Sequence, residues 1–165
     1  MIPEGVLYLN QNDPVVSGAL TLGAYEPYFA EEFRKHLTKE STVVDIGANL
    51  GYYTLIASAH SKKVIAYEPE KENLALLRKT IKRNALQNVL VMEKGIGAQD
   101  EDLTLTLDPD NKGKHTLLSN TDGEKQTIPV TTLDSSIALQ HISHVDLIKM
   151  DIEGWEGYAF KGMKN

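Results

Sequence analysis

Four acidic residues, each at the end of a run of apolar residues, are the side chains best placed to do chemistry in this chain. Asp45 and Glu68 end such runs in "TVVDIGANLG" and "VIAYEPE", and Asp151 and Glu153 end another in "DLIKMDIEGWE". In open parallel α/β sheets, ligands bind beyond the carboxyl ends of the strands. We therefore expect these carboxylates to lie around one crevice.

The turn after Asp45 carries two glycines, Gly47 and Gly51, which allow a tight turn and a close approach of backbone to ligand. Their spacing differs from the dinucleotide fingerprint G-x-G-x-x-G, because Asn49 stands where the second glycine would be. The carboxylate of Asp45 would repel a diphosphate and attract an ammonium or sulfonium cation. S-adenosylmethionine carries both cations and no phosphate, so the turn favours it over a dinucleotide.

The second half of such a site is an acid at the end of the next strand, where paired ribose hydroxyls need a hydrogen-bond acceptor. Glu68 occupies that place, 23 positions after Asp45. The order strand, D-x-G-x-x-x-G, helix, strand, acid therefore predicts an S-adenosylmethionine site. A structural role for both acids, in turn stabilisation or helix capping, is the alternative, and a nicotinamide-dependent dehydrogenase is disfavoured by the missing fingerprint.

Asp151 and Glu153 are candidates for the catalytic groups. If the methyl group of such a cofactor passes to a hydroxyl, the hydroxyl proton must be removed, and a carboxylate can accept it, hydrogen-bond the acceptor, or hold a divalent cation that acidifies the hydroxyl. In the alternative interpretation, Asp151 positions the methionine tail and Glu153 caps a helix that starts at Gly154 or Trp155. Lys149 either pairs with a nearby acid or contacts the substrate.

Hydrophobic periodicity predicts an α/β fold in which strands and helices alternate. The predicted helices are 26–37 (with Pro27 in its first turn), 51–59 and 71–86, and the predicted parallel strands are 42–46, 64–67, 89–93 and 146–152. Right-handed crossovers then give a Rossmann-like sheet with strand order 3-2-1-4. Between the third and fourth strands, segments 103–107, 114–119 and 126–131 predict a small antiparallel insertion, followed by a short helix that Ser135 caps and that ends near His141.

The chain is long enough for one domain, which we divide into an N-terminal lead-in (1–40), a cofactor-binding core (41–97), the insertion (98–135) and a last segment with the fourth strand (136–165). The formal net charge of −6 argues against nucleic-acid binding. There is no signal-peptide pattern and no apolar run of about 20 residues, so we expect a cytoplasmic protein with no membrane partner. The chain has no cysteine, which excludes disulfides and thiolate metal sites.

The motifs "VVDIGANLGYYT", "AYEPE", "VTTLDS" and "LIKMDIEGWE", in this order, resemble the FkbM family of S-adenosylmethionine-dependent methyltransferases. The resemblance covers residues 13–163 and implies a Rossmann-like methyltransferase that transfers the methyl group to a small hydroxylated acceptor such as a sugar or polyketide. It implies cofactor-binding roles for Asp45, Gly47, Asn49, Gly51 and Glu68, to which we add their neighbours Ala48 and Pro69. Glu26, in the family-like "AYEP", either reaches the cofactor as part of an N-terminal lid or caps its own helix.

In the fold of that family the strand formed by "DLIKMDI" is an interior strand, whereas here only "EGWEGYAFKGMKN" follows it. Its outer edge would carry Leu147, Ile148, Met150 and Ile152 with no proline among them. Such an edge is a template for strand pairing. We expect it to pair with a second copy of the chain or with a further C-terminal segment. A cofactor-binding domain without catalysis is the second function hypothesis.

Overall fold

A parallel sheet runs through the middle of the molecule, with its strands in the order β3-β2-β1-β7. These strands are β1 (Thr42–Ile46), β2 (Lys63–Tyr67), β3 (Val89–Met92) and β7 (Leu147–Met150). The computed structural model describes residues 2–108, 115, 117 and 124–164. The predicted order 3-2-1-4 is confirmed, and the sheet is Rossmann-like.

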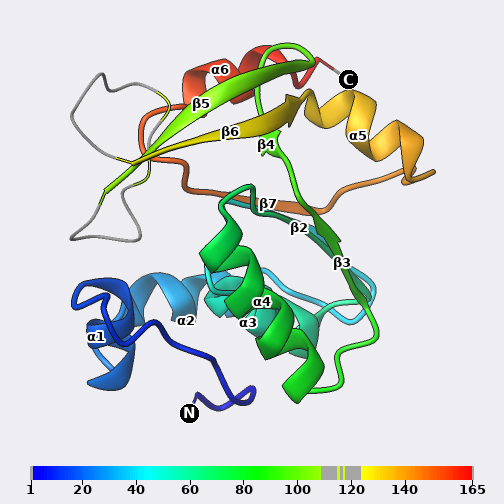
Figure 1. Ribbon diagram of the computed structural model, residues 1–165. Coiled ribbons are helices and arrows are strands. Elements are labelled where there is room, and N and C mark those ends of the chain that lie inside the picture. The colour runs from blue at the N-terminus through cyan, green and yellow to red at the C-terminus, as the bar shows by residue number, and fades with distance from the viewer. Residues whose placement is uncertain (1, 109–114, 116, 118–123, 165) are drawn as a thin grey trace.

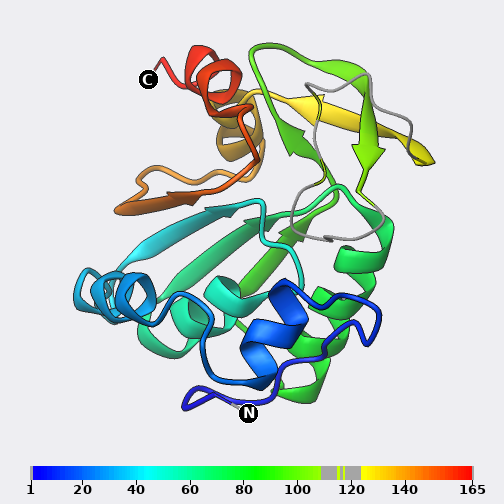
Figure 2. The same cartoon turned by 90° about the vertical axis from the view of Figure 1, so that its left-hand side faces the viewer.

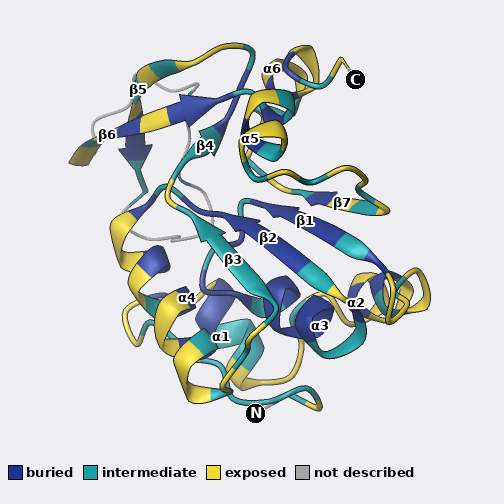
Figure 3. Cartoon of the chain, turned by 90° about the vertical axis from the view of Figure 1, so that its right-hand side faces the viewer, coloured by how far each residue is buried: buried dark blue, intermediate teal, exposed yellow. Residues whose placement is uncertain are grey.

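Figures 1 and 3 show that the two faces of this sheet are covered by different kinds of structure. One face carries the helices α1 (Val16–Thr21), α2 (Pro27–Lys35), α3 (Tyr52–His60) and α4 (Lys71–Arg83). The other face carries α5 (Leu133–Leu139), α6 (Glu156–Lys161) and a second sheet built from β4 (Gly95–Ile96), β5 (Glu101–Leu107) and β6 (Glu124–Thr131). None of the described helices combines the length and apolar character needed to span a bilayer.

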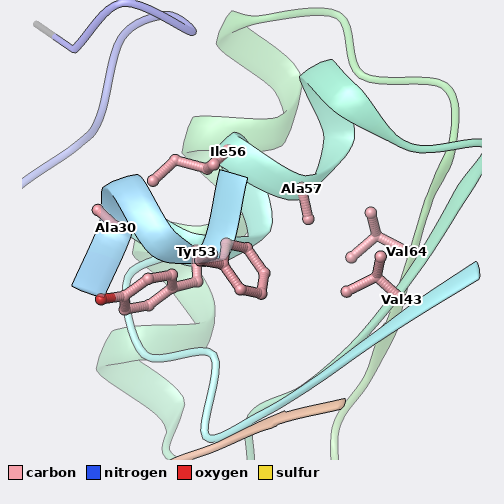
Figure 4. Packing of buried hydrophobic residues seen from close by; sticks show 7 residues of the cluster. Ala30, Val43, Tyr53, Ile56, Ala57 and Val64 are labelled. Atoms are coloured by element: carbon pink, nitrogen blue, oxygen red, sulfur yellow. The ribbon is translucent and has the colours of Figure 1, made fainter. Parts of the chain in front are cut away.

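Both faces of β1 and β2 are buried, which explains why these strands read as continuous apolar runs. Val43 and Val64 lie on the face covered by α2 and α3, and Figure 4 shows them beside each other with Ala57. Val44 and Ile65 lie on the opposite face and pack in a cluster that includes residues of α5 and α6. Burying a valine or isoleucine side chain contributes about 1.5–3 kcal/mol, so these pairs hold the layers together.

At the starts of α4 and α5, a side chain satisfies the first backbone N–H groups of the helix. The carboxylate of Glu70 accepts hydrogen bonds from the N–H groups of Glu72 and Asn73 and so starts α4. At α5 the cap is the hydroxyl of Thr132, which accepts from the N–H of Ser135. The prediction that Ser135 itself is the cap is wrong, because Ser135 already lies inside the helix, and α5 ends at Leu139.

The insertion pairs β5 with β6 in antiparallel register, as predicted, but β4 pairs with β6 in parallel. The predicted antiparallel pairing is thus confirmed, and the parallel pairing of β4 is an addition that was not predicted. Neither β4 nor α1 was expected, because two residues carry no periodicity and α1 is only six residues long. The strand predicted over 114–119 falls largely outside the described residues, and His115 and Leu117, which are described, belong to no strand.

The first residues of the chain run along α4 (Figure 2). Val6 and Asn84 exchange two hydrogen bonds, from the Val6 N–H to Asn84 Oδ1 (2.9 Å) and from Asn84 Nδ2 to the Val6 carbonyl (2.7 Å). Arg34 on α2 makes a bidentate ion pair with Glu4. These contacts fix the lead-in against the helical face of the sheet and so position the residues between α1 and α2.

At the other end, β7 is shorter than predicted, because regular pairing stops at Met150. Asp146 fixes its start by exchanging hydrogen bonds with Thr42. Within the described residues β7 pairs with β1 alone, and Ile148 on it is 41% exposed. Pairing of its outer edge with a second copy or a further segment stays a prediction.

Candidate active site

The carboxyl ends of β1, β2 and β7 border a crevice made of two adjoining hollows. The insertion hollow, of ≈ 620 Å³, lies toward the second sheet and is lined by residues that include Glu68, Pro69, Asn73, Ile96, Leu105, His115, Ile128 and Trp155. The lead-in hollow, of ≈ 690 Å³, lies toward α1 and α2 and is lined by residues that include Val15, Tyr25, Glu26, Ala48, Tyr52, Tyr53 and Lys149.

Four residues line both hollows: Gly47, Asn49, Asp151 and Glu153. They come from the turn after β1 and the segment after β7, two regions a hundred residues apart in the chain. The crevice is therefore continuous across the end of the sheet, and its midpoint carries two carboxylates. A ligand that extends from one hollow into the other would pass between the glycine turn and these acids.

The backbone of the glycine turn is hydrogen-bonded internally at each step. The N–H groups of Gly47 and Ala48 both donate to the Tyr67 carbonyl at 3.0 Å, and that of Asn49 donates to Glu68 Oε2 at 2.7 Å. The N–H of Leu50 donates to Asn49 Oδ1, and the N–H of Gly51 donates to the Ala48 carbonyl. The turn thus has no spare N–H group with which to cradle a phosphate, in contrast to a dinucleotide-binding loop.

The two glycines of the turn are required by packing within the protein. Gly47 has φ +76°, and a Cβ there would lie 2.0 Å from the carbonyl oxygen of Asp151. Gly51 has φ +98°, and a Cβ there would lie 2.7 Å from Leu77 Cδ1 on α4. The structure shows that Gly47 also packs closely against the segment after β7, and its approach to a ligand stays a prediction. Gly51 lines neither hollow.

Glu68 is the buried carboxylate of the insertion hollow. Its Oε2 accepts from the Asn49 N–H (2.7 Å) and its Oε1 accepts from the Glu70 N–H (2.9 Å). Burial raises the pKa of Glu68 to about 7, although both backbone hydrogen bonds favour the ionised form. A carboxylate has about four lone-pair positions. Each oxygen of Glu68 therefore retains acceptor capacity toward the hollow.

Asp45 was predicted to face the ligand, but the structure places it inside the fold. It is fully buried and lines neither hollow. Its Oδ2 accepts a hydrogen bond from the Thr54 hydroxyl (2.6 Å), and its Oδ1 lies 3.6 Å from the ammonium of Lys149. The negative charge of Asp45 is therefore balanced within the protein, by the residue adjacent to it in the β1–β7 register.

The lead-in contributes an acid and a group of tyrosines to its hollow. Glu26 has φ +43° at the start of α2, makes no capping hydrogen bond there, and accepts from the Tyr53 hydroxyl at 2.6 Å. Burial and then the adjacent Glu26 raise the pKa of Tyr53, which remains a proton donor. The capping interpretation of Glu26 is wrong. Tyr25 stacks edge-on against Tyr52 and forms another part of the same wall.

Asp151 and Glu153 are both exposed at the point where the hollows meet. The helix that Glu153 was expected to cap begins later, at Glu156, and has no side-chain cap. The carboxylate of Glu156 instead accepts from the N–H of Ile152. Within the described residues, no three acidic or histidine side chains gather closely enough to hold a metal ion.

Sequence analysis missed most of the outer wall of the insertion hollow. This wall is apolar and includes Ile96, Leu105 and Ile128 from β4, β5 and β6. Trp155 completes it and stacks on Tyr158, with ring centroids 4.0 Å apart. The alternation in 103–107 predicted a half-buried strand, but nothing local showed that the strand faces the crevice.

Comparison with known proteins identifies the family. Residues 45–165 match the methyltransferase FkbM domain, and the chain belongs to that methyltransferase family. "Methyltransferase 1" from Beauveria bassiana (strain ARSEF 2860) is 23% identical over 146 residues, which cover 75% of this chain and 59% of that protein. The crystal structure of methyltransferase FkbM from Methylobacillus flagellatus KT matches with a TM-score of 0.54 and 21% identity, over 84% of this chain and 36% of that one. The chain thus spans about three-fifths of the curated relative's length.

Proposed function

We propose that this protein is an S-adenosylmethionine-dependent methyltransferase that methylates a hydroxyl group of a small, neutral acceptor such as a sugar or polyketide. The observation that carries the proposal is the environment of Glu68: a buried carboxylate at the end of β2, oriented by two backbone N–H groups and facing an apolar hollow. This arrangement suits a ribose, whose two adjacent hydroxyls are both donors.

The two hollows match the two halves of such a cofactor. An adenosine fits the insertion hollow, where Ile96 and Ile128 offer an apolar surface and Glu68 an acceptor. A charged amino-acid tail fits the lead-in hollow, where Glu26 offers a carboxylate to its ammonium. The glycine turn that separates the hollows contributes close packing and no phosphate-binding N–H groups, which argues against a dinucleotide.

The cofactor supplies a methyl group on a positively charged sulfur, and the protein must align the acceptor and remove its proton. Asp151 lies where the hollows meet and is exposed, so its carboxylate can accept the hydroxyl proton. Glu153 adjoins it and can hold a second hydroxyl of the acceptor. A positioned base contributes roughly 10²–10⁴-fold to such a reaction, and alignment of the reactants contributes several kcal/mol more.

A methyl-transfer assay tests the proposal. The protein is incubated with S-adenosylmethionine and a panel of sugars and polyketide-type alcohols, and formation of methylated product and S-adenosylhomocysteine is followed by mass spectrometry. We expect product from at least one hydroxylated acceptor, and loss of that product in Asp151→Asn. Tight binding of S-adenosylhomocysteine without turnover of any acceptor would instead support a cofactor-binding domain without catalysis.

A further inference from the structure

Lys149 is a buried cation that the proposed reaction does not use. It lies on β7 and is 8% exposed, and its ammonium lies 5.1 Å from the centre of the Tyr53 ring. It is the one basic residue among the described residues that line the lead-in hollow, beside the carboxylates of Glu26, Asp151 and Glu153. Its position raises the question of which anion it meets there.

Contacts within the protein use only part of its hydrogen-bonding capacity. An ammonium has three N–H donors. In the part of the chain that the structure describes, the ammonium of Lys149 makes one hydrogen bond, to the Gly47 carbonyl at 3.2 Å. Its distance of 3.6 Å to Asp45 Oδ1 is too long for a hydrogen bond, and that oxygen has no hydrogen-bond partner. The pair with Asp45 therefore balances the charge without using the remaining donors.

The backbone of the glycine turn offers no free donor to an anion in the lead-in hollow. The N–H groups from Gly47 to Gly51 are all hydrogen-bonded within the protein. Lys94, the basic residue of the insertion hollow, lines the far side of the crevice and not the lead-in hollow. A ligand carboxylate in the lead-in hollow would be repelled by three acids, and Lys149 is the one basic side chain among the described residues of that hollow that would offset this repulsion.

We propose that Lys149 is the residue that recognises the carboxylate of the cofactor's amino-acid tail, while Glu26 receives the ammonium of that tail. This proposal rests on the proposed function, because it assumes that the lead-in hollow holds that tail. Lys149 is then a specificity-determining residue: it selects a cofactor with an intact α-carboxylate over one that lacks it. Such a charge-assisted bond contributes enough for roughly a tenfold to hundredfold preference.

The test compares two ligands, S-adenosylhomocysteine and its decarboxylated analogue, by calorimetric titration. Removing Lys149 alone would leave Asp45 as an unpaired buried charge, so the informative variant is the double variant Asp45→Asn/Lys149→Met, which removes both charges. Asp45→Asn alone retains the lysine and is the matched control, and Lys94→Met controls for loss of a positive charge elsewhere in the crevice. Thermal unfolding establishes that each variant is folded.

We expect wild type, Asp45→Asn and Lys94→Met to prefer S-adenosylhomocysteine by at least tenfold, and the double variant to bind the two ligands within about threefold of each other. A preference that persists in the folded double variant would overturn the proposal and place the carboxylate elsewhere, such as the first N–H groups of α3. Equal weakening of both ligands, with the preference intact, would also overturn it, because Lys149 would then act only through the fold. If wild type binds neither ligand, the proposed function itself fails.

Discussion

The two hollows of the crevice adjoin at the same turn yet offer opposite chemistry. The insertion hollow has an apolar wall around one buried carboxylate, Glu68, and the lead-in hollow has tyrosines, three acids and one lysine. An apolar wall with a single acceptor suits a flat, weakly polar group that carries hydroxyls, and a charged wall suits a zwitterion. The difference supports the proposal that one ligand with two chemically distinct halves occupies both hollows.

The largest effect is expected at Gly47, which both hollows share. In Gly47→Ala the new Cβ would clash with the Asp151 carbonyl and the residue would hold an unfavourable positive φ, so we expect the free energy of unfolding to fall by about 3 kcal/mol or more. Urea denaturation measures this loss. Gly157→Ala is the control, since a Cβ there meets no atom within 4 Å. Equal stability of the two variants would show that the turn is not packed against the segment after β7.

A second prediction concerns Asp151, at the junction of the hollows. If its carboxylate accepts the hydroxyl proton, Asp151→Asn should lower the turnover number by roughly 10²–10⁴-fold and change the dissociation constant of S-adenosylhomocysteine by no more than about threefold. Single-turnover kinetics and calorimetry measure the two quantities. Glu93→Gln, an exposed carboxylate outside both hollows, is the control. A loss of affinity with an unchanged single-turnover rate would assign Asp151 to the amino-acid tail.

The pH dependence of stability reports on Glu68, the buried carboxylate of the insertion hollow. Burial raises the pKa of Glu68 from 4.5 to about 7, and nearby Glu70 and Asp45 add to the rise. Between these values the folded protein keeps a proton that the unfolded chain has released, so this contribution to stability is present at low pH and lost as the pH rises through 7.

Relative to Glu68→Gln, the wild-type free energy of unfolding should therefore fall between pH 4.5 and pH 8, by about 3 kcal/mol at most. Urea denaturation of both proteins at several pH values measures the difference, in which the titration of other groups cancels. A difference that stays constant over this range would show that Glu68 ionises as an exposed glutamate does.

The smallest effect is expected in the lead-in hollow, at Glu26. Glu26→Gln keeps an acceptor for the Tyr53 hydroxyl but removes a charge that is exposed to solvent, and exposed ion pairs contribute about 0–1 kcal/mol. We expect S-adenosylhomocysteine to bind about threefold more weakly, and 5′-methylthioadenosine, which lacks the amino-acid tail, to bind as before. If both ligands bound more weakly to the same extent, Glu26 would not distinguish a ligand with the amino-acid tail from one without it, and the assignment of the tail to the lead-in hollow would be contradicted.

The parts of the fold that sequence predicted are those set by local pattern. The β-branched runs that end at Ile46 and Tyr67, and the regular helix between Lys71 and Arg83, carry strong periodicity, and their order implied the sheet topology. The parallel pairing of β4 with β6 was missed, because it joins a two-residue strand to a segment more than thirty residues away.

The residues of the candidate site divide in the same way, into those that local pattern places and those that tertiary packing places. Glu68 was placed in the crevice correctly, since the end of a parallel strand is defined by the strand itself. Asp45 was expected in the crevice, and its burial depends on Lys149, which lies 104 residues later. No local signal reveals such a pairing. The tyrosines of the lead-in hollow and the apolar wall of the insertion hollow were likewise brought to the site by tertiary packing.

The most direct test of the central claim is a calorimetric titration of S-adenosylhomocysteine and NAD into wild type and Glu68→Ala. We predict that wild type binds one S-adenosylhomocysteine per chain, that Glu68→Ala binds it at least tenfold more weakly while still folded, and that neither binds NAD. An unchanged affinity in folded Glu68→Ala, or binding of NAD without S-adenosylhomocysteine, would contradict the account.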